Sequence, residues 1–137
     1  MLKDKAAAYS QEKNCNCAES TLLAAEEYYG FGNGAEDAAF VGGFGGGIGC
    51  GMTCGALCGS IAALGKLLLD GPAHTMPEFR ALCAEYAGIF RENMGGTDCR
   101  DVKPNFAVPG LGCVKAIEKN AELLEAFIAA HGLAEKK

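Results

Sequence analysis

The chain has 137 residues, of which 50% are hydrophobic, and it carries a formal net charge of −5. This length predicts one domain over residues 1–137, large enough to bury a core. The acidic balance argues against a nucleic-acid partner, because binding to phosphates requires a basic surface patch.

The first third of the chain is predicted to be helical. Asn16, followed three residues later by Glu19, has the spacing of a capping box, so a helix is expected to begin at Cys17. Gly30 is expected to end this helix, because glycine readily adopts the left-handed conformation that follows a helix. We expect helices over Lys3–Lys13, Cys17–Tyr29 and Ala35–Val41.

The segment Phe44–Gly59 is rich in glycine and contains three cysteines and no charged residue. It has neither a Gly-x-Gly-x-x-Gly pattern nor a Walker A lysine, and no strand precedes it, so nucleotide binding is not supported. We expect its glycines to let the backbone and other helices come close to a cysteine sulfur.

Capping residues and apolar spacing predict the helices of the second half. Thr53 is expected to cap a buried helix, and Thr75 with Glu78 has the pattern of a capping box. Asp98 is expected to cap a short turn at Cys99. We expect helices over Cys54–Leu69, from Thr75 to about Gly95, and over Cys113–Ala130, with a loop over Pro104–Gly112. Because strand alternation is nowhere sustained, the fold class is all-α, a compact bundle of about five helices with a glycine-rich loop.

One stretch without charge, Ala38–Gly65, is long enough to cross a bilayer. It also has the spacing of small residues found where transmembrane helices touch. Its many glycines weaken its tendency to form a helix and make it less apolar than a typical membrane span. We therefore expect a buried core segment and no membrane partner.

The chain contains eight cysteines, and Met1–Lys5 lacks the apolar segment of a secretory signal. We expect a cytoplasmic protein in which the thiols serve metal, cluster or redox chemistry rather than a disulfide framework. Four cysteines share one setting, at a predicted helix start after a cap-type residue. There the free N–H groups and the helix dipole favour the thiolate, the form that ligates metals and attacks disulfides. These four are Cys17, Cys54, Cys99 and Cys113.

The sequence gives less reason to expect metal or redox chemistry at the other four cysteines. Cys83 lies on the apolar face of its helix, where we expect it to fill the core. Cys58, one turn after Cys54, could supply a fifth sulfur or simply pack. Cys15 and Cys50 lie in loops beside two of the four helix-start cysteines, where each could resolve a disulfide or act as a ligand, but structural roles are favoured for both. No Cys-x-x-Cys pair occurs, so thioredoxin-type exchange and zinc-ribbon spacing lack support.

The run Asn16–Glu19, the run Thr53–Gly59, and Cys99 and Cys113 together resemble the C-GCAxxG-C-C family of redox-active proteins, over nearly the whole chain. The family motif stands here as Cys54-Gly55-Ala56-Leu57-Cys58-Gly59. The resemblance implies that Cys17, Cys54, Cys99 and Cys113 are the four family cysteines. A similar domain occurs in split-Soret cytochromes beside an iron–sulfur centre, which implies cluster ligation. The haem does not carry over, because Cys-x-x-Cys-His is absent.

We therefore expect a redox-active protein that binds an iron–sulfur cluster, of the 2Fe-2S type, for electron transfer or redox sensing. The expected ligands are Cys17, Cys54, Cys99 and Cys113. One alternative is a metal-free thiol–disulfide protein in which Cys54 pairs with another cysteine. A second is structural zinc on the same four thiolates in an interaction module. The redox partner, any enzymatic activity and the formation of a homodimer stay open.

Overall fold

The computed structural model describes residues 1–136, and this part of the chain contains seven α-helices and no strand. The all-α prediction is confirmed, but the expected number of about five helices is too low. Lys137, the last residue of the predicted domain, lies outside the described residues. The helices are α1 (Leu2–Glu12), α2 (Cys17–Tyr29), α3 (Ala35–Val41), α4 (Gly55–Leu68), α5 (Phe79–Met94), α6 (Cys99–Phe106) and α7 (Val114–Ala130). Four shorter helical turns are η1 (Gly42–Phe44), η2 (Gly47–Gly51), η3 (Ala73–Thr75) and η4 (Leu133–Lys136).

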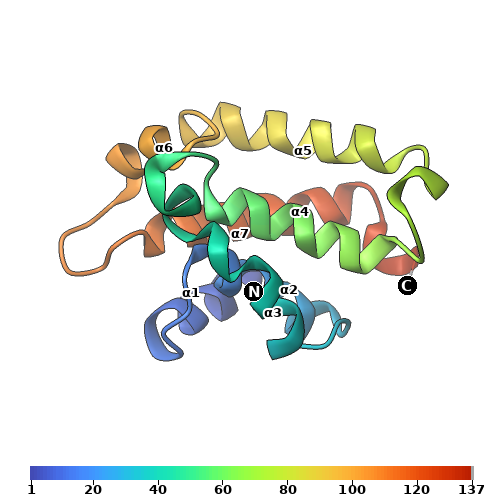
Figure 1. Cartoon of the computed structure of the whole chain (residues 1–137), viewed down its shortest axis with the longest axis horizontal. Helices are drawn as coiled ribbons and strands as arrows, with labels where there is room; N and C mark the ends of the chain where they lie inside the picture. The colour runs from blue at the N-terminus through green and yellow to red at the C-terminus, as the bar shows by residue number, and fades with distance from the viewer. Residues whose placement is uncertain (137) are drawn as a thin grey trace.

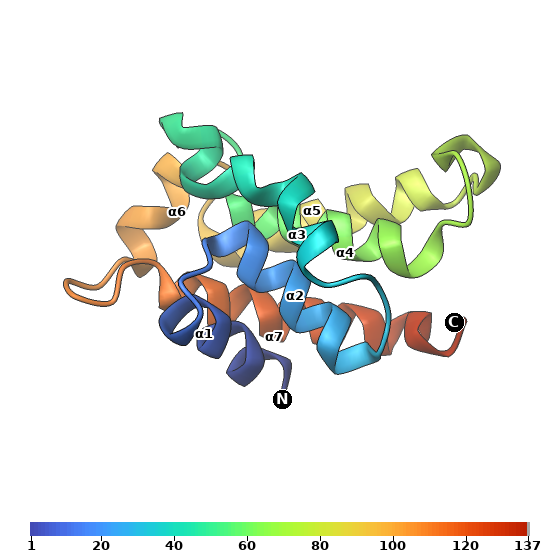
Figure 2. The ribbon, with the colours of Figure 1, turned by 60° about the horizontal axis from the view of Figure 1, so that its bottom comes forward.

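Helices α4 and α7 run through the middle of the molecule (Figure 1). Helix α5 lies along one side of them, and α1, α2 and α3 lie on the other. Helix α2 packs closely against α4, and α1 packs against both α2 and α7. Helix α6 and the glycine-rich segment meet at one end of the molecule, which Figure 2 shows from a second direction.

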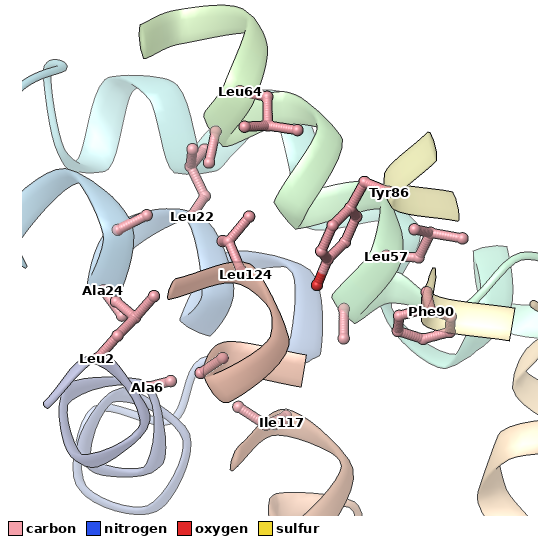
Figure 3. Packing of buried hydrophobic residues seen from close by; sticks show 14 of the residues in the cluster. Leu2, Ala6, Leu22, Ala24, Leu57, Leu64, Tyr86, Phe90, Ile117 and Leu124 are labelled. Atoms are coloured by element: carbon pink, nitrogen blue, oxygen red, sulfur yellow. The ribbon is translucent and has the colours of Figure 1, made fainter. Parts of the chain in front are cut away.

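The core lies where α2, α4, α5 and α7 face one another. Leu64, Tyr86, Phe90 and Leu124 are fully buried there, and Figure 3 shows several of these side chains converging from the different helices. Burying a side chain of this size stabilises the folded state by about 2 kcal/mol. This packing fixes the positions of the four helices relative to one another, and therefore also the positions of the residues at their ends.

A buried polar network crosses this core around Asn120. The Tyr86 hydroxyl donates to Asn120 Oδ1 at 2.6 Å, and Asn120 Nδ2 donates to Ser60 Oγ at 2.9 Å and to the Ala56 carbonyl at 3.3 Å. Since Ser60, Tyr86 and Asn120 are fully buried, each would be costly to leave without a partner. The network fixes α5 and α7 relative to the first turns of α4.

Helix α2 begins and ends as predicted. The Glu19 N–H donates to Asn16 Oδ1 at 3.0 Å and the Asn16 N–H donates to Glu19 Oε1 at 2.9 Å, so both halves of the capping box form. Gly30 follows the helix in the left-handed conformation, with φ of 72°.

Two predictions about helix boundaries are wrong. The Thr75 hydroxyl does not cap a helix but donates to the Pro72 carbonyl at 2.6 Å, and α5 begins only at Phe79. The expected loop at Pro104 is instead the second half of α6. The helix continues past this proline because the Ala107 N–H donates to the Lys103 carbonyl at 2.8 Å, while Val102 is anchored in the core.

The uncharged stretch Ala38–Gly65 is divided among α3, η1, η2 and α4. None of the helices within residues 1–136 combines the length and the apolarity needed to cross a membrane.

Candidate functional site

The four cysteines at the predicted helix starts line one small cavity of about 80 Å³. They reach it from four separate places: the first turn of α2, the residue before α4, the first turn of α6 and the residue before α7. The cavity is lined by residues of both α6 and the glycine-rich segment, and Figure 1 shows that these two segments meet at one end of the molecule. Its lining consists of Cys17, Gly46, Cys54, Ala56, Cys99, Val102, Lys103, Cys113 and Ala116.

Cys17 is the first residue of α2, so the capping box at Asn16 fixes its position. Asn16 Nδ2 also donates to the Gly42 carbonyl at 2.9 Å, which ties the start of α2 to the glycine-rich segment. Gly55 of α4 lies directly against Cys17. A Cβ at Gly55 would collide with Cys17 Sγ and would lie 2.9 Å from the Phe44 carbonyl oxygen. Glycine is therefore required for α2 and α4 to approach this closely.

Cys54 and Cys99 are brought together by a short pairing of two backbone segments. The Cys54 N–H donates to the Thr97 carbonyl at 2.8 Å, and the Cys99 N–H donates to the Met52 carbonyl at 2.6 Å. Thr53 and Asp98 form the antiparallel bridge between these bonds. These two backbone hydrogen bonds make the relative position of the two cysteines a property of the backbone rather than of flexible side chains.

The structure corrects two of the expected helix starts. Helix α4 begins at Gly55, so Cys54 is itself the capping residue and Thr53 lies outside the helix. Helix α7 begins at Val114, so Cys113 has the same place there. Cys17 and Cys99 are first residues of α2 and α6, as predicted.

The glycine-rich segment forms one wall of the cavity through Gly46. Gly46 and Gly47 both have φ of 66°, and a Cβ at Gly47 would collide with the Met52 backbone and lie 2.8 Å from Cys99 Cβ. Ile48 shares the left-handed conformation, with φ of 60°, and its side chain is exposed. The glycines of this segment therefore let its backbone pass close to Cys99 and to Met52.

Cys113 is held by the turn that precedes α7. Val108 and Gly112 form a bridge in which each N–H donates to the other's carbonyl at 3.0 Å. Gly112 has φ of 60°, which redirects the chain into Cys113. The Ile117 N–H then donates to the Cys113 carbonyl at 3.1 Å, so the cysteine is joined to the first turn of α7.

Burial decides the protonation of Cys54, contrary to the expectation that a helix start would favour its thiolate. Cys54 is only 6% exposed, and this burial raises the pKa of its thiol to about 12. The N–H groups of Ala56 and Leu57 act to lower that pKa, while the nearby Cys17 and Cys99 act to raise it. The pKa of Cys113 is also raised, mainly by burial and then by Cys99 and Cys17, with Lys103 opposing. Without a bound cation, Cys54 is thus a neutral thiol at physiological pH.

The remaining four cysteines do not line this cavity. Cys50 is exposed in η2, with its thiol 3.5 Å from the Gly47 carbonyl, and Cys15 lies before α2, with its thiol 3.7 Å from the Lys13 carbonyl. Cys83 was expected to fill the core, but it is only partly buried. It lines an apolar groove of about 540 Å³ between α4 and α5, together with Cys58.

The lining also includes residues that the sequence did not single out. Lys103 is the one charged residue among them, and Val102 and Ala116 give the cavity apolar walls. The i, i+3 and i, i+4 spacing of Cys99, Val102 and Lys103 would have placed these three on one face, had α6 been recognised as a helix. Among the residues that the structure describes, no three cysteine, histidine or carboxylate side chains are arranged to hold one metal ion.

A family model described as "Putative redox-active protein (C_GCAxxG_C_C)" matches residues 15–127. The match spans all four cysteines of the cavity. A comparison with curated proteins found no match, and a comparison with solved structures found none either.

Proposed function

Because the chain belongs to the C_GCAxxG_C_C family, we propose that Cys17, Cys54, Cys99 and Cys113 together bind an iron–sulfur cluster of the 2Fe-2S type for electron transfer or redox sensing. The observation that carries the proposal is their convergence on one cavity from four separate elements. Four cysteine thiolates are the usual ligand set of such a cluster. When bound, it would accept and release a single electron.

The surroundings of the sulfurs suit a negatively charged group. Cysteine ligands must lose their protons, so the cavity has to stabilise negative charge when the group is bound. Lys103 lines the cavity, and the N–H groups of Ala56 and Leu57 lower the pKa of Cys54. Carboxylates are absent from the lining. Hydrogen bonds to cluster sulfurs and the apolar walls at Val102 and Ala116 would tune the reduction potential.

A purely thiol–disulfide function is less well supported by these residues. Attack on a disulfide requires a thiolate, and a thiol with a pKa of about 12 is almost entirely protonated near neutral pH. Cys54 is also nearly inaccessible, with 6% of its surface exposed. Neither the high pKa nor the burial of Cys54 would prevent metal binding, because a metal cation displaces the thiol proton and would reach the sulfur from inside the cavity.

A single zinc ion also fits these sulfurs less well. One tetrahedral ion needs all of its ligands within about 2.3 Å of a single point. Within residues 1–136 no group of three potential ligands meets the arrangement needed for one ion. A cluster of two irons divides four thiolates between two metal positions and therefore tolerates a wider spread of sulfurs.

The decisive experiment is anaerobic purification, with reconstitution if needed, followed by iron and sulfide analysis and absorption and electron paramagnetic resonance spectra. We expect two irons and two sulfides for each chain, and loss of the visible bands in Cys54→Ser. The matched control is Cys50→Ser, because Cys50 lies in the same segment but is exposed and outside the cavity.

Three results would refute the cluster. The first is colourless, iron-free protein after reconstitution. The second is stoichiometric zinc without sulfide, which would favour the interaction module. The third is a reversible mass change of two hydrogens with no metal, which would favour a disulfide. Equal loss of colour in Cys54→Ser and Cys50→Ser would refute the assignment of the ligands.

A further inference from the structure

A second unusual group lies away from the cysteines, in the middle of α2. Glu26 is only 4% exposed. Its Oε1 accepts a hydrogen bond from the Gly34 N–H at 2.8 Å, but no donor within residues 1–136 reaches its buried Oε2. Unpaired buried carboxylate oxygens are costly, so the state of this oxygen needs an explanation.

The loop between α2 and α3 is built around this carboxyl group. The Gly30 and Phe31 N–H groups donate to the backbone carbonyl of Glu26 at 2.9 and 3.0 Å. Gly32, with φ of 80°, lies so close that a Cβ there would overlap the Glu26 side chain. The loop backbone thus covers the carboxyl group and shields it from water.

The partner of Glu26 is a second carboxyl group, that of Asp37 on α3. The adjacent loop residues Asn33 and Gly34 bind the two carboxyl groups, because the Asn33 N–H donates to Asp37 at 2.7 Å and the Gly34 N–H donates to Glu26 at 2.8 Å. An interaction between the two carboxyl groups raises the pKa of Glu26 and lowers that of Asp37, and a hydrogen bond between them requires one shared proton. Asp37 already accepts from the Asn33 N–H at 2.7 Å and lies 3.8 Å from Lys66 Nζ of α4, so it is the better stabilised anion. Since Glu26 Oε1 already accepts from the Gly34 N–H, we place the proton on Oε2, which no donor within the described residues reaches.

The surrounding charges agree with this assignment. Burial raises the pKa of Glu26 to about 7 and the hydrogen bond to Asp37 acts in the same direction, whereas the Gly34 N–H and Lys66 act to lower it. The pKa of Asp37 is lowered, first by Glu26 and then by the Asn33 N–H. From α1, the neutral hydroxyl of Tyr9 is the other titratable group that senses Glu26.

Each residue of this carboxyl pair belongs to a segment that also supplies a residue of the cysteine cavity or leads to one. Glu26 and Cys17 belong to the same helix, α2. Asp37 belongs to α3, which leads directly into η1 and then, through the extended Gly45, to Gly46 in the cavity wall. The contact between Glu26 and Asp37 therefore helps to hold the glycine-rich wall against the helix that carries Cys17.

We propose that Glu26 and Asp37 form a proton-binding site that controls how tightly α3 and the glycine-rich wall of the cavity pack against α2. With one proton bound, the pair closes the loop over residues 31–34 and holds α3 in place. When that proton leaves to solvent, two adjacent carboxylates remain with only Lys66 and the loop N–H groups to offset them. The loop and α3 then open, and the wall formed by Gly46 loosens.

Two measurements on the full chain test this proposal. A carboxyl-carbon NMR titration of Glu26 should give a midpoint near pH 7, and Asp37→Asn should lower that midpoint, because the asparagine amide can donate to the Glu26 carboxylate. Hydrogen exchange of residues 31–46 should lose protection as pH rises from 4.5 to 7, about tenfold for each pH unit after correction for intrinsic exchange, because the closed state binds one more proton than the open state in this range. Above pH 7 the loss should level off.

Two variants sharpen the exchange experiment. Glu26→Gln is permanently neutral, so its protection should be independent of pH over this range. Glu27→Gln should behave as the unchanged chain does, because Glu27 is exposed and paired with Lys5. The proposal is overturned by an ordinary titration of Glu26 near pH 4.5, or by the same pH-dependent loss of protection in Glu26→Gln. If Glu26→Gln does not fold, the midpoints of the Glu26 titration in the unchanged chain and in Asp37→Asn still test the proposal.

Discussion

Replacing Gly59 by alanine tests whether the close approach of α2 and α4 is held rigidly. Gly59 lies within α4 and faces α2, where a Cβ would lie 2.6 Å from the Ala18 carbonyl oxygen, 3.0 Å from Thr21 Cβ and 3.2 Å from Ala18 Cα. Two of these three atoms belong to the backbone and cannot move aside by rotating a side chain. The added methyl group must therefore push the two helices apart.

Two opposing effects set the expected magnitude. Alanine in place of glycine favours the helix by about 1 kcal/mol. Overpacking a tight core contact costs about 1–3 kcal/mol. Because the contact at Gly59 is with backbone, we expect the upper part of this range and a net loss of about 1–2 kcal/mol in the free energy of unfolding. The displacement would also move Cys17 away from Cys54, so retention of the proposed iron–sulfur cluster should fall in parallel.

The matched control is Gly88→Ala in α5, where a Cβ would meet nothing within 4 Å. Only the propensity effect acts there, so this variant should be more stable by about 0.5–1 kcal/mol. Urea unfolding at one temperature, followed by circular dichroism, measures both. If Gly59→Ala proves as stable as Gly88→Ala, the two helices can separate without cost, and close packing at Gly59 does not hold α2 against α4.

Three further variants test other parts of the structure. Asn120→Ala should lower the free energy of unfolding by about 3 kcal/mol, because it leaves buried Tyr86 and Ser60 without their partner; urea unfolding measures it, and a loss below about 1 kcal/mol would contradict it. Asn16→Ala removes half of the capping box and should cost about 1 kcal/mol in a thermal unfolding experiment. The unchanged chain should lose about 3 kcal/mol as pH rises from 4.5 through 7, because the pKa of Glu26 is about 7 in the folded chain and 4.5 otherwise, so the folded state binds the extra proton. Glu26→Gln should abolish that loss, and a flat stability profile in the unchanged chain would contradict the assignment.

Local sequence signals predicted the elements that local interactions determine. The capping box at Asn16 and the glycine at residue 30 fixed both ends of α2, since each acts within one turn of the helix. The bounds of α3, Ala35–Val41, also agree. The same kind of signal failed at Thr75, because this residue ends the η3 turn, where its hydroxyl and its N–H both donate to the Pro72 carbonyl. Competing local bonds of this sort cannot be ranked from residue types alone.

Helix α6 shows what local signals cannot provide. Pro104 argues for a loop, yet burial of Val102 and contacts with α7 keep the segment helical. These are tertiary contacts with distant residues, so no local pattern reports them. The protonation of Cys54 is a related case, because its predicted place as the first residue of a helix favoured a thiolate, whereas its burial raises the pKa of the thiol. How many neighbours surround a capping residue depends on the complete fold.

The four cavity cysteines span the chain from residue 17 to residue 113. Chains that emerge from the ribosome fold from the N-terminus, and contacts between distant residues form more slowly than those within helices. Three of the sulfurs are therefore synthesised before the turn that supplies Cys113. A group bound by all four cysteines would link residue 17 to residue 113 only after the chain has been synthesised to Cys113. It would therefore stabilise only the completed fold. Maturation of this protein should accordingly follow synthesis, and chains that end before Cys113 should not retain the group.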